Sequence, residues 1–124
     1  MKFKDWKYSS VLLVFLGITA CTKDNISPTT PTNVDCSSLI ASYANDIQPI
    51  MNSSCAISGC HVVGFSSGDF TNYVDLKAKV VDGTLKNRTI VQMNMPPANS
   101  TGPNLTTAQL DLLTCWIEAG APEN

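Results

Sequence analysis

The clearest pattern of apolar and polar positions lies near the C-terminus, in LTTAQLDLLTCWIEAGAP. Thr106 is placed to cap a helix, and Gln109 three residues later completes a capping box. The glycine and proline of GAP stop the helix at its other end. The pattern therefore predicts a helix over about residues 107–119. Three apolar residues recur at helical spacing and give it one buried face: Leu110, Leu113 and Ile117.

A weaker pattern, NDIQPIMNSSC, predicts a short helix over about residues 47–52. Asn45 or Asp46 is expected to cap it. Pro49 is compatible with this assignment because the first turn of a helix tolerates proline. The single mature methionine in this stretch, Met51, is expected to pack in the core.

The stretch TNYVDLKAKVVDG predicts another helix, capped by Thr71 and ended before Gly83. Its apolar face would carry Tyr73, Leu76 and Val80. A further helical turn is expected at residues 85–88. Prolines and a glycine between residues 90 and 106 predict a loop there. With no alternating strand pattern, the expected fold class is all-α, a small domain of three to four helices with long loops.

The first twenty residues read as a signal peptide that is no part of the fold. Basic residues precede the short apolar run VLLVFLGI, which ends in ITAC. This order is similar to the lipobox of bacterial lipoproteins, in which the cysteine, here Cys21, is diacylated. A plain secretory signal or a buried strand is the alternative. We expect a signal peptide over residues 1–20, a flexible Ser-, Thr- and Pro-rich tether over 21–35, and one domain over 36–124.

Charge narrows the choice of partner. Without the first twenty residues the chain keeps five basic and nine acidic residues, a net charge of −4. Nucleic-acid binding needs a basic surface, so this class of partner is not expected.

The positions of the five cysteines indicate different roles. Cys36 and Cys115 lie at the two ends of the domain and are predicted to form a disulfide in the oxidising compartment that export implies. Such a bond would stabilise the fold by roughly 4 kcal/mol on the chain-entropy model. Pairing of one of them with Cys55 or Cys60, or no pairing, is the alternative.

The stretch CAISGCH holds the other two cysteines and the single histidine of the chain. Covalent haem attachment requires two thiols and an imidazole directly after the second, usually as Cys-x-x-Cys-His. Here Cys55, Cys60 and His61 have a spacer of four residues. The two extra residues can bulge outward at Ser58 and Gly59, since glycine permits positive backbone angles.

A second axial ligand is available downstream, in MNMPP. A methionine thioether opposite a histidine is the ligation of electron-transfer cytochromes. Met95 is preferred to Met93, because the prolines directly behind it restrict the loop.

The order of a short helix, CAISGCH, a middle helix, MPP and the final helix resembles the mono-haem class I cytochrome c domains, particularly those of bacterial lipoproteins. In that family DIQPI precedes the haem motif and WIEAGAP follows an MPP loop. The resemblance covers about residues 43–122 and implies a cytochrome c-like domain with one covalent haem c. It implies thioether bonds at Cys55 and Cys60, His61 as the proximal ligand and Met95 as the distal ligand. The longer spacer is similar to that of some multi-haem cytochromes.

These residues predict an exported, lipid-anchored electron carrier, not an enzyme, that works between a donor and an acceptor redox protein at the bacterial cell envelope. A haemless envelope lipoprotein with a second disulfide between Cys55 and Cys60 is the first alternative. A zinc site that recruits Cys36 or Cys115 is another. An iron left open on its distal side would instead bind small molecules. The haem interpretation predicts a cavity beside Cys60, His61 and Met95.

Overall fold

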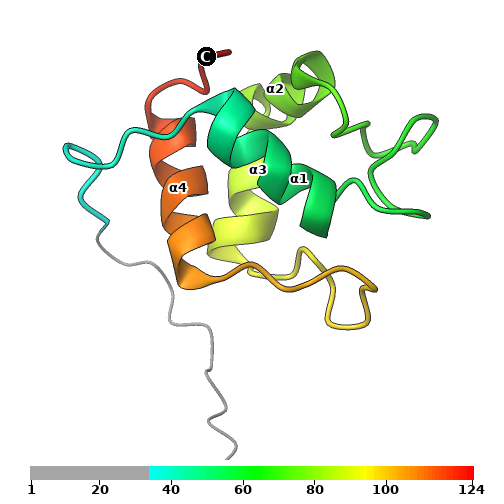
Figure 1. Cartoon of the computed structure of the whole chain (residues 1–124). Coiled ribbons are helices and arrows are strands. Elements are labelled where there is room, and N and C mark those ends of the chain that lie inside the picture. Colours follow the sequence, from blue (N-terminus) through cyan, green and yellow to red (C-terminus); the bar gives the residue numbers. More distant parts are fainter. Residues whose placement is uncertain (1–33) are drawn as a thin grey trace, which may run out of the picture.

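The computed structural model describes residues 34–124 (Figure 1). The predicted signal peptide, Cys21 and all but the end of the predicted tether lie outside these residues. Residues 34–124 form helices joined by loops and contain no strand, which confirms the predicted all-α class. The helices are η1 (Tyr43–Ile47), α1 (Gln48–Ser54), α2 (Tyr73–Val81), α3 (Thr84–Lys86), η2 (Asn87–Val91) and α4 (Thr107–Glu118).

The first helix begins four residues earlier than the sequence pattern predicted. Ser42, not Asn45 or Asp46, is its N-cap: the Ser42 hydroxyl accepts the Asn45 amide at 3.3 Å, and Asp46 Oδ2 accepts the Ser42 amide at 2.8 Å. The first turn, η1, is a wide π turn that runs into α1 without a break. Pro49 is the second residue of α1 and so lies in its first turn, as predicted, where its missing N–H has no partner to lose.

The middle helices also differ in detail from the prediction. Asn72, not Thr71, caps α2, because its side chain accepts the Asp75 amide at 2.9 Å. The Thr71 hydroxyl instead donates a hydrogen bond to Asp69 Oδ1 at 2.6 Å. The turn expected at residues 85–88 is longer, since α3 continues into η2. Gly83 lies between α2 and α3 with φ of 77°, a conformation that favours glycine.

The last helix, α4, matches its prediction most closely. The predicted capping box is present: Thr106 accepts the Gln109 amide, and the Gln109 side chain accepts the Thr106 amide at 2.9 Å. The helix ends at Glu118, and Gly120 follows in the left-handed region.

Aromatic side chains join α4, the first helix and α2. Trp116 is fully buried and stacks on Tyr43 at a centroid distance of 6.0 Å. Tyr43 meets Tyr73 edge to face at 5.0 Å. The indole N–H of Trp116 is donated to Pro122 O at 2.9 Å, so its polar atom is satisfied within the core. Met51 is also fully buried, as predicted.

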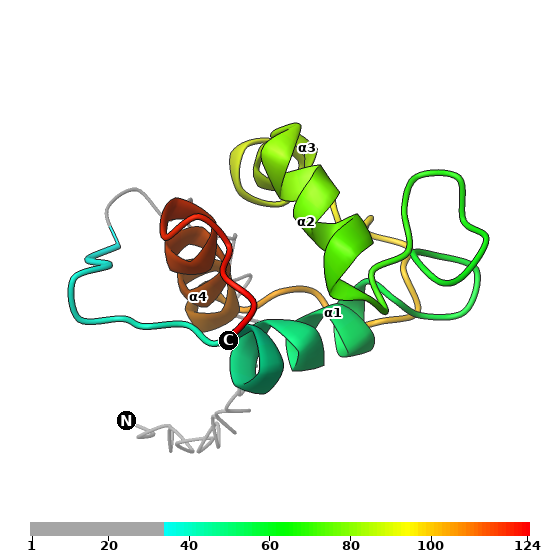
Figure 2. The ribbon, with the colours of Figure 1, turned by 90° about the horizontal axis from the view of Figure 1, so that it is seen from above.

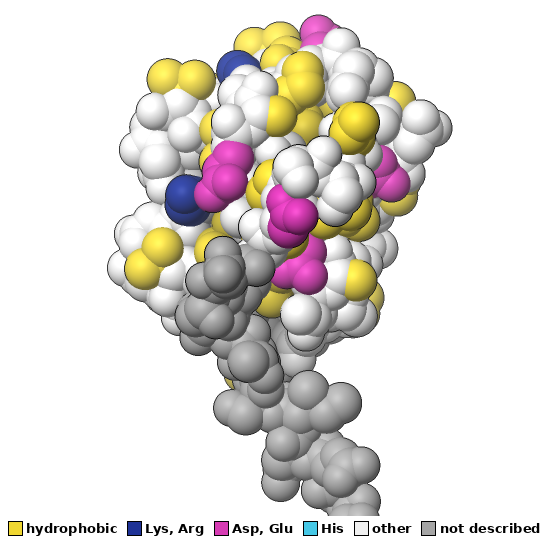
Figure 3. Space-filling view, turned by 90° about the vertical axis from the view of Figure 1, so that its left-hand side faces the viewer, with side chains coloured by type: hydrophobic (Ala, Val, Ile, Leu, Met, Phe, Trp, Pro, Cys, Tyr) yellow, Lys and Arg dark blue, Asp and Glu magenta, His cyan; other side chains and the backbone are white. Residues whose placement is uncertain are grey.

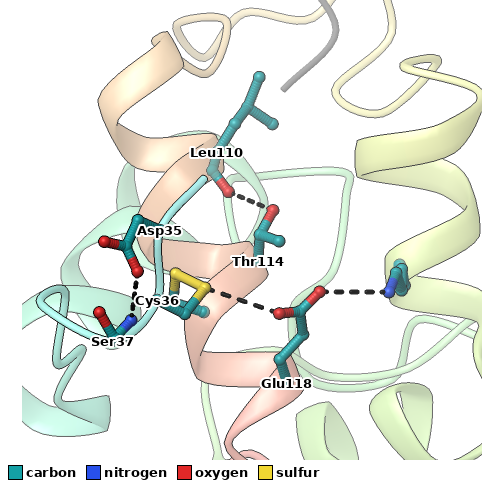
Figure 4. The surroundings of a disulfide bond; sticks show 8 residues. Asp35, Cys36, Ser37, Leu110, Thr114 and Glu118 are labelled. Atoms are coloured by element: carbon teal, nitrogen blue, oxygen red, sulfur yellow. Dashed lines mark hydrogen bonds and ion pairs between the residues drawn. A yellow bond between two sulfur atoms is a disulfide. The ribbon is translucent and has the colours of Figure 1, made fainter. Parts of the chain in front are cut away.

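Cys36 and Cys115 form the predicted disulfide, with their Cα atoms 5.2 Å apart (Figure 4). It attaches the segment that precedes the first helix to the last turn of α4. Glu118 lies beside it, with Oε2 3.6 Å from Cys36 Sγ and Oε1 3.8 Å from Lys86 Nζ. The space-filling view shows acidic side chains gathered on the face that this segment crosses (Figure 3).

The C-terminal residues close the same end of the molecule. Asn124 O accepts the Ala44 amide at 3.0 Å, and Asn124 Oδ1 accepts the Tyr43 amide at 2.8 Å. These bonds satisfy amides of the first helical turn that have no partner within the helix. Seen from above, residues 34–42 and α4 lie on one side of the molecule and the long loops on the other (Figure 2).

Candidate cofactor site

Two long loops and four helical segments, α1, α2, α3 and η2, surround a cavity of about 610 Å³. We call residues 55–72 the motif loop and residues 92–106 the methionine loop. The volume is within the roughly 300–1,000 Å³ typical of small-molecule and cofactor sites. Most of the wall is apolar, with Phe65 and Phe70 from the motif loop, Leu85 from α3, and Pro96 and Pro97 from the methionine loop.

The four predicted cofactor residues all lie on the wall of this cavity: Cys55, Cys60, His61 and Met95. The cavity that the haem interpretation predicted is therefore present. Met93 is not on the wall.

The first half of the motif loop folds back on the end of α1. Cys55 follows α1 directly, and the His61 amide is donated to its carbonyl oxygen at 3.1 Å. Ser58 and Gly59 are exposed, and Gly59 has φ of 81°, as the predicted bulge requires. The two ends of the spacer thus stay together, while Ser58 is exposed and Gly59 also lies on the wall of the cavity.

The His61 imidazole is held in one orientation. Its Nδ1 lies 3.2 Å from Gly68 O. A carbonyl only accepts hydrogen bonds, so Nδ1 carries the proton and Nε2 keeps the lone pair that can bind a metal. Phe70 stacks parallel to the imidazole at 4.0 Å, and Phe65 meets it edge to face at 5.1 Å.

The surroundings of His61 favour the neutral imidazole. Burial lowers its pKa below the ordinary value, and the positive charge of Lys79 acts in the same direction. The hydrogen bond to Gly68 opposes both effects. The neutral form is the one that ligates a metal ion.

Cys55 and Cys60 carry free thiols. Burial raises the pKa of the Cys55 thiol to about 11, and the neighbouring Cys60 adds to this shift. The second disulfide of the haemless alternative is not formed here. The zinc alternative needed Cys36 or Cys115, and these two are joined to each other.

The methionine loop is folded so that Met95 reaches the cavity. The backbone amides of Asn94 and Met95 both donate hydrogen bonds to Arg88 O, at 3.0 and 3.2 Å. This carbonyl is in η2, whose side chains line the same cavity. Met93, two residues earlier, has a left-handed backbone with φ of 51°.

Two cationic side chains complete the wall, Lys79 from α2 and Arg88 from η2. Lys79 Nζ forms an ion pair with Asp82 Oδ2 at 3.5 Å. The Arg88 guanidinium donates a hydrogen bond to Gln92 Oε1 at 3.3 Å. Thr89 also lines the cavity, but its hydroxyl is donated to Leu85 O at 2.7 Å within its own helix. Lys79 was not identified from the sequence, since α2 carries two lysines, Lys77 and Lys79, and the sequence alone does not show which of them faces the cavity.

The arrangement offers two soft sulfur nucleophiles, one imidazole lone pair and one thioether around an apolar space. Within residues 34–124, no three His, Cys, Asp or Glu side chains are grouped as a metal site would require. The helices of this same region include none long and apolar enough to span a membrane. Comparison with known proteins found no matching family, no similar curated protein and no similar solved structure.

Proposed function

We propose that this protein is a lipid-anchored c-type cytochrome of the bacterial cell envelope that carries single electrons between two redox proteins. The observation that carries the proposal is the cavity on whose wall two free thiols, one imidazole and one methionine meet: Cys55, Cys60, His61 and Met95.

The residues present fit a covalently attached haem. Cys55 and Cys60 would hold it through thioether bonds, His61 Nε2 would be the proximal ligand and Met95 the distal one. The apolar wall gives the macrocycle a surrounding of low dielectric constant, which tunes its potential. Bound there, the haem supplies a one-electron couple, while the protein supplies attachment, ligation and burial.

Two neighbouring residues, Gly68 and Phe70, orient the His61 imidazole. The Gly68 carbonyl fixes the tautomer and the ring plane, and the stacked Phe70 ring restricts rotation. A methionine thioether on the other side favours the reduced iron and so raises the reduction potential. His61 and Met95 would thus hold the haem, and the haem would supply the one-electron chemistry of a carrier.

The cellular setting of the proposal comes from the sequence alone. A lipid on Cys21 would hold the domain at a membrane, and the tether over residues 21–35 would separate the two. The acidic mature charge argues against a nucleic-acid partner, and an electron carrier needs a donor and an acceptor redox protein.

The first test is the attachment of haem. The full-length chain, produced in bacteria with a haem maturation system, is expected to give a band that stains for covalent haem on a denaturing gel. Cys55→Ala/Cys60→Ala is the matched control and is expected to give no stain. A wild-type chain without stain, whose mass fits polypeptide and lipid only, would contradict the proposal and favour the haemless lipoprotein.

The second test separates an electron carrier from a protein that binds small molecules at an open iron. Met95→Ala is expected to remove the methionine-to-iron absorption band of the ferric protein and to allow carbon monoxide to bind the ferrous form. Met93→Ala, on the same loop but off the cavity wall, is the control and should resemble the wild type. Ready carbon monoxide binding by the wild type would favour a sensor or peroxidase instead.

A further inference from the structure

The methionine loop contacts the rest of the domain on both sides of Met95. Before it, the amides of Asn94 and Met95 are held by Arg88 O in η2. After it, the loop passes the end of α1 at Gly102. Since α1 leads directly into Cys55, this second contact joins the two halves of the proposed haem site.

Gly102 leaves no room for a side chain. A Cβ atom at this position would lie 2.9 Å from Ser53 O. It would also lie 3.0 Å from Ile57 Cδ1 and 3.4 Å from Ser54 Cα. The first separation is below normal van der Waals contact with a main-chain atom, which no side-chain rotation can relieve, so either the loop or α1 would have to move.

The requirement for glycine at this position is one of packing and not of backbone angle. Gly102 is not among the residues with a positive φ, whereas Gly59, Gly64 and Gly83 are. At these three, an added Cβ would meet nothing within 4 Å. Alanine at position 102 therefore perturbs the approach of the loop to α1 without forcing an unfavourable backbone conformation.

The contact lies at the edge of the cavity. Ser54 on one side and Ser100 on the other both line it. The Gly102 amide is donated to Ser100 Oγ at 3.1 Å, which ties the contact to the part of the loop nearest the cavity. A displacement at Gly102 is thus transmitted along the loop toward Met95.

We infer that Gly102 is a positioning residue for the distal ligand: its close approach to α1 keeps the methionine loop closed, so that Met95 stays on the iron. A side chain at position 102 opens the loop and turns a closed electron-transfer site into one that binds small ligands. This inference rests on the proposed haem site.

The test compares three variants of the full-length chain, matured with haem: Gly102→Ala, Ser100→Ala and Thr101→Ala. Gly102→Ala is expected to retain covalent haem but to lose most of the methionine-to-iron band. Its apparent affinity for carbon monoxide should rise about tenfold or more, because that affinity scales with the fraction of molecules whose distal position is open. Ser100→Ala removes the hydrogen-bond acceptor of the Gly102 amide. It should weaken the methionine-to-iron band and raise the carbon monoxide affinity, but by less than Gly102→Ala. Thr101 is exposed, and Thr101→Ala should match the wild type.

A double variant shows whether Gly102 acts through Met95. Adding Gly102→Ala to Met95→Ala should not raise carbon monoxide affinity further, because the ligand that the glycine positions is already gone. An unchanged methionine band in Gly102→Ala, or additive effects in the double variant, overturns the inference. If Gly102→Ala does not fold, an unchanged Ser100→Ala overturns it. Absence of haem from the wild type contradicts the proposed function instead, so the two failures are distinguishable.

Discussion

The two ends of this domain are built in different ways. At one end, which we call the closed end, residues 34–42 and the C-terminal residues pack against α4 and the first helix. At the other, the open end, the motif loop and the methionine loop surround the cavity of about 610 Å³ (Figures 1 and 2). The closed end uses the chain's own side chains and one disulfide, whereas the open end leaves space for another group.

The contrast shows how so small a domain keeps an apolar cavity open at one end. The closed end holds the largest buried side chain, Trp116, and the interlocked aromatic rings, so it can direct the fold by itself. The loops at the open end bury fewer large side chains. In the proposed cytochrome, the apolar faces of Phe65, Phe70 and Leu85 would be covered by haem instead of by protein.

The largest effect on the closed end is expected from loss of the disulfide. Cys36→Ser/Cys115→Ser should lower the free energy of unfolding by about 4 kcal/mol, because the unfolded chain regains the freedom that a cross-link over 79 residues removes. Urea unfolding followed by circular dichroism measures the change. The haem-free Cys55→Ala/Cys60→Ala variant is the control at the open end, and its free energy of unfolding should fall by less. If both double variants lost the same free energy of unfolding, the disulfide would not stabilise the closed end more than the two free thiols stabilise the open end.

A smaller effect should separate two leucines of equal size. Leu113 in α4 is fully buried, and Leu113→Ala is expected to cost about 3 kcal/mol, because it leaves a void enclosed by protein. Leu85 is 3% exposed but already borders the cavity, so Leu85→Ala in the haem-free protein should cost less, about 2 kcal/mol. Bound haem should reduce the difference between the two unfolding costs, because Leu85 would then pack against the haem. Urea unfolding of both variants, with and without haem, measures this, and equal costs without haem would contradict it.

The closed end was also the easier one to predict from sequence. The capping box of α4 depends on Thr106 and Gln109 alone, and these are three residues apart. The disulfide followed from the chain positions of Cys36 and Cys115. The start of α1 was predicted to within one residue, with Pro49 in its first turn, but η1 before it was missed, because a wide π turn leaves no periodicity in the sequence.

At the open end, sequence reasoning identified the residues with reactive side chains and missed those that orient them. Cys55, Cys60, His61 and Met95 belong to short motifs that the chemistry of haem explains. Gly68 holds His61 through a backbone carbonyl, and although its φ of 115° favours glycine, the letter does not show which side chain that carbonyl contacts. Gly102 depends on the approach of two segments far apart in the chain. Such contacts follow only from the fold.

The smallest effect concerns the junction of α2 and α3, where one carboxylate supports the open end. Asp82 accepts the Thr84 amide at 2.8 Å, and this hydrogen bond, with Lys79 nearby, holds the pKa of the Asp82 carboxyl below its ordinary value. The charged form is therefore favoured in the folded state. Its stabilising contribution should be complete above the pKa of the unfolded chain and lost as pH falls through the folded pKa.

Asp82→Asn should flatten this acid dependence, because the amide oxygen still accepts the Thr84 N–H but no longer titrates. Urea midpoints measured between about pH 6 and pH 3 should fall less steeply in the variant than in the wild type. Asp111→Asn removes the same charge from α4 at the closed end and is the matched control, so the difference between the two variants reports the Thr84 hydrogen bond and not the lost charge alone. If both substitutions reduced the pH dependence of the urea midpoint equally, the acid sensitivity would not be specific to the junction of α2 and α3.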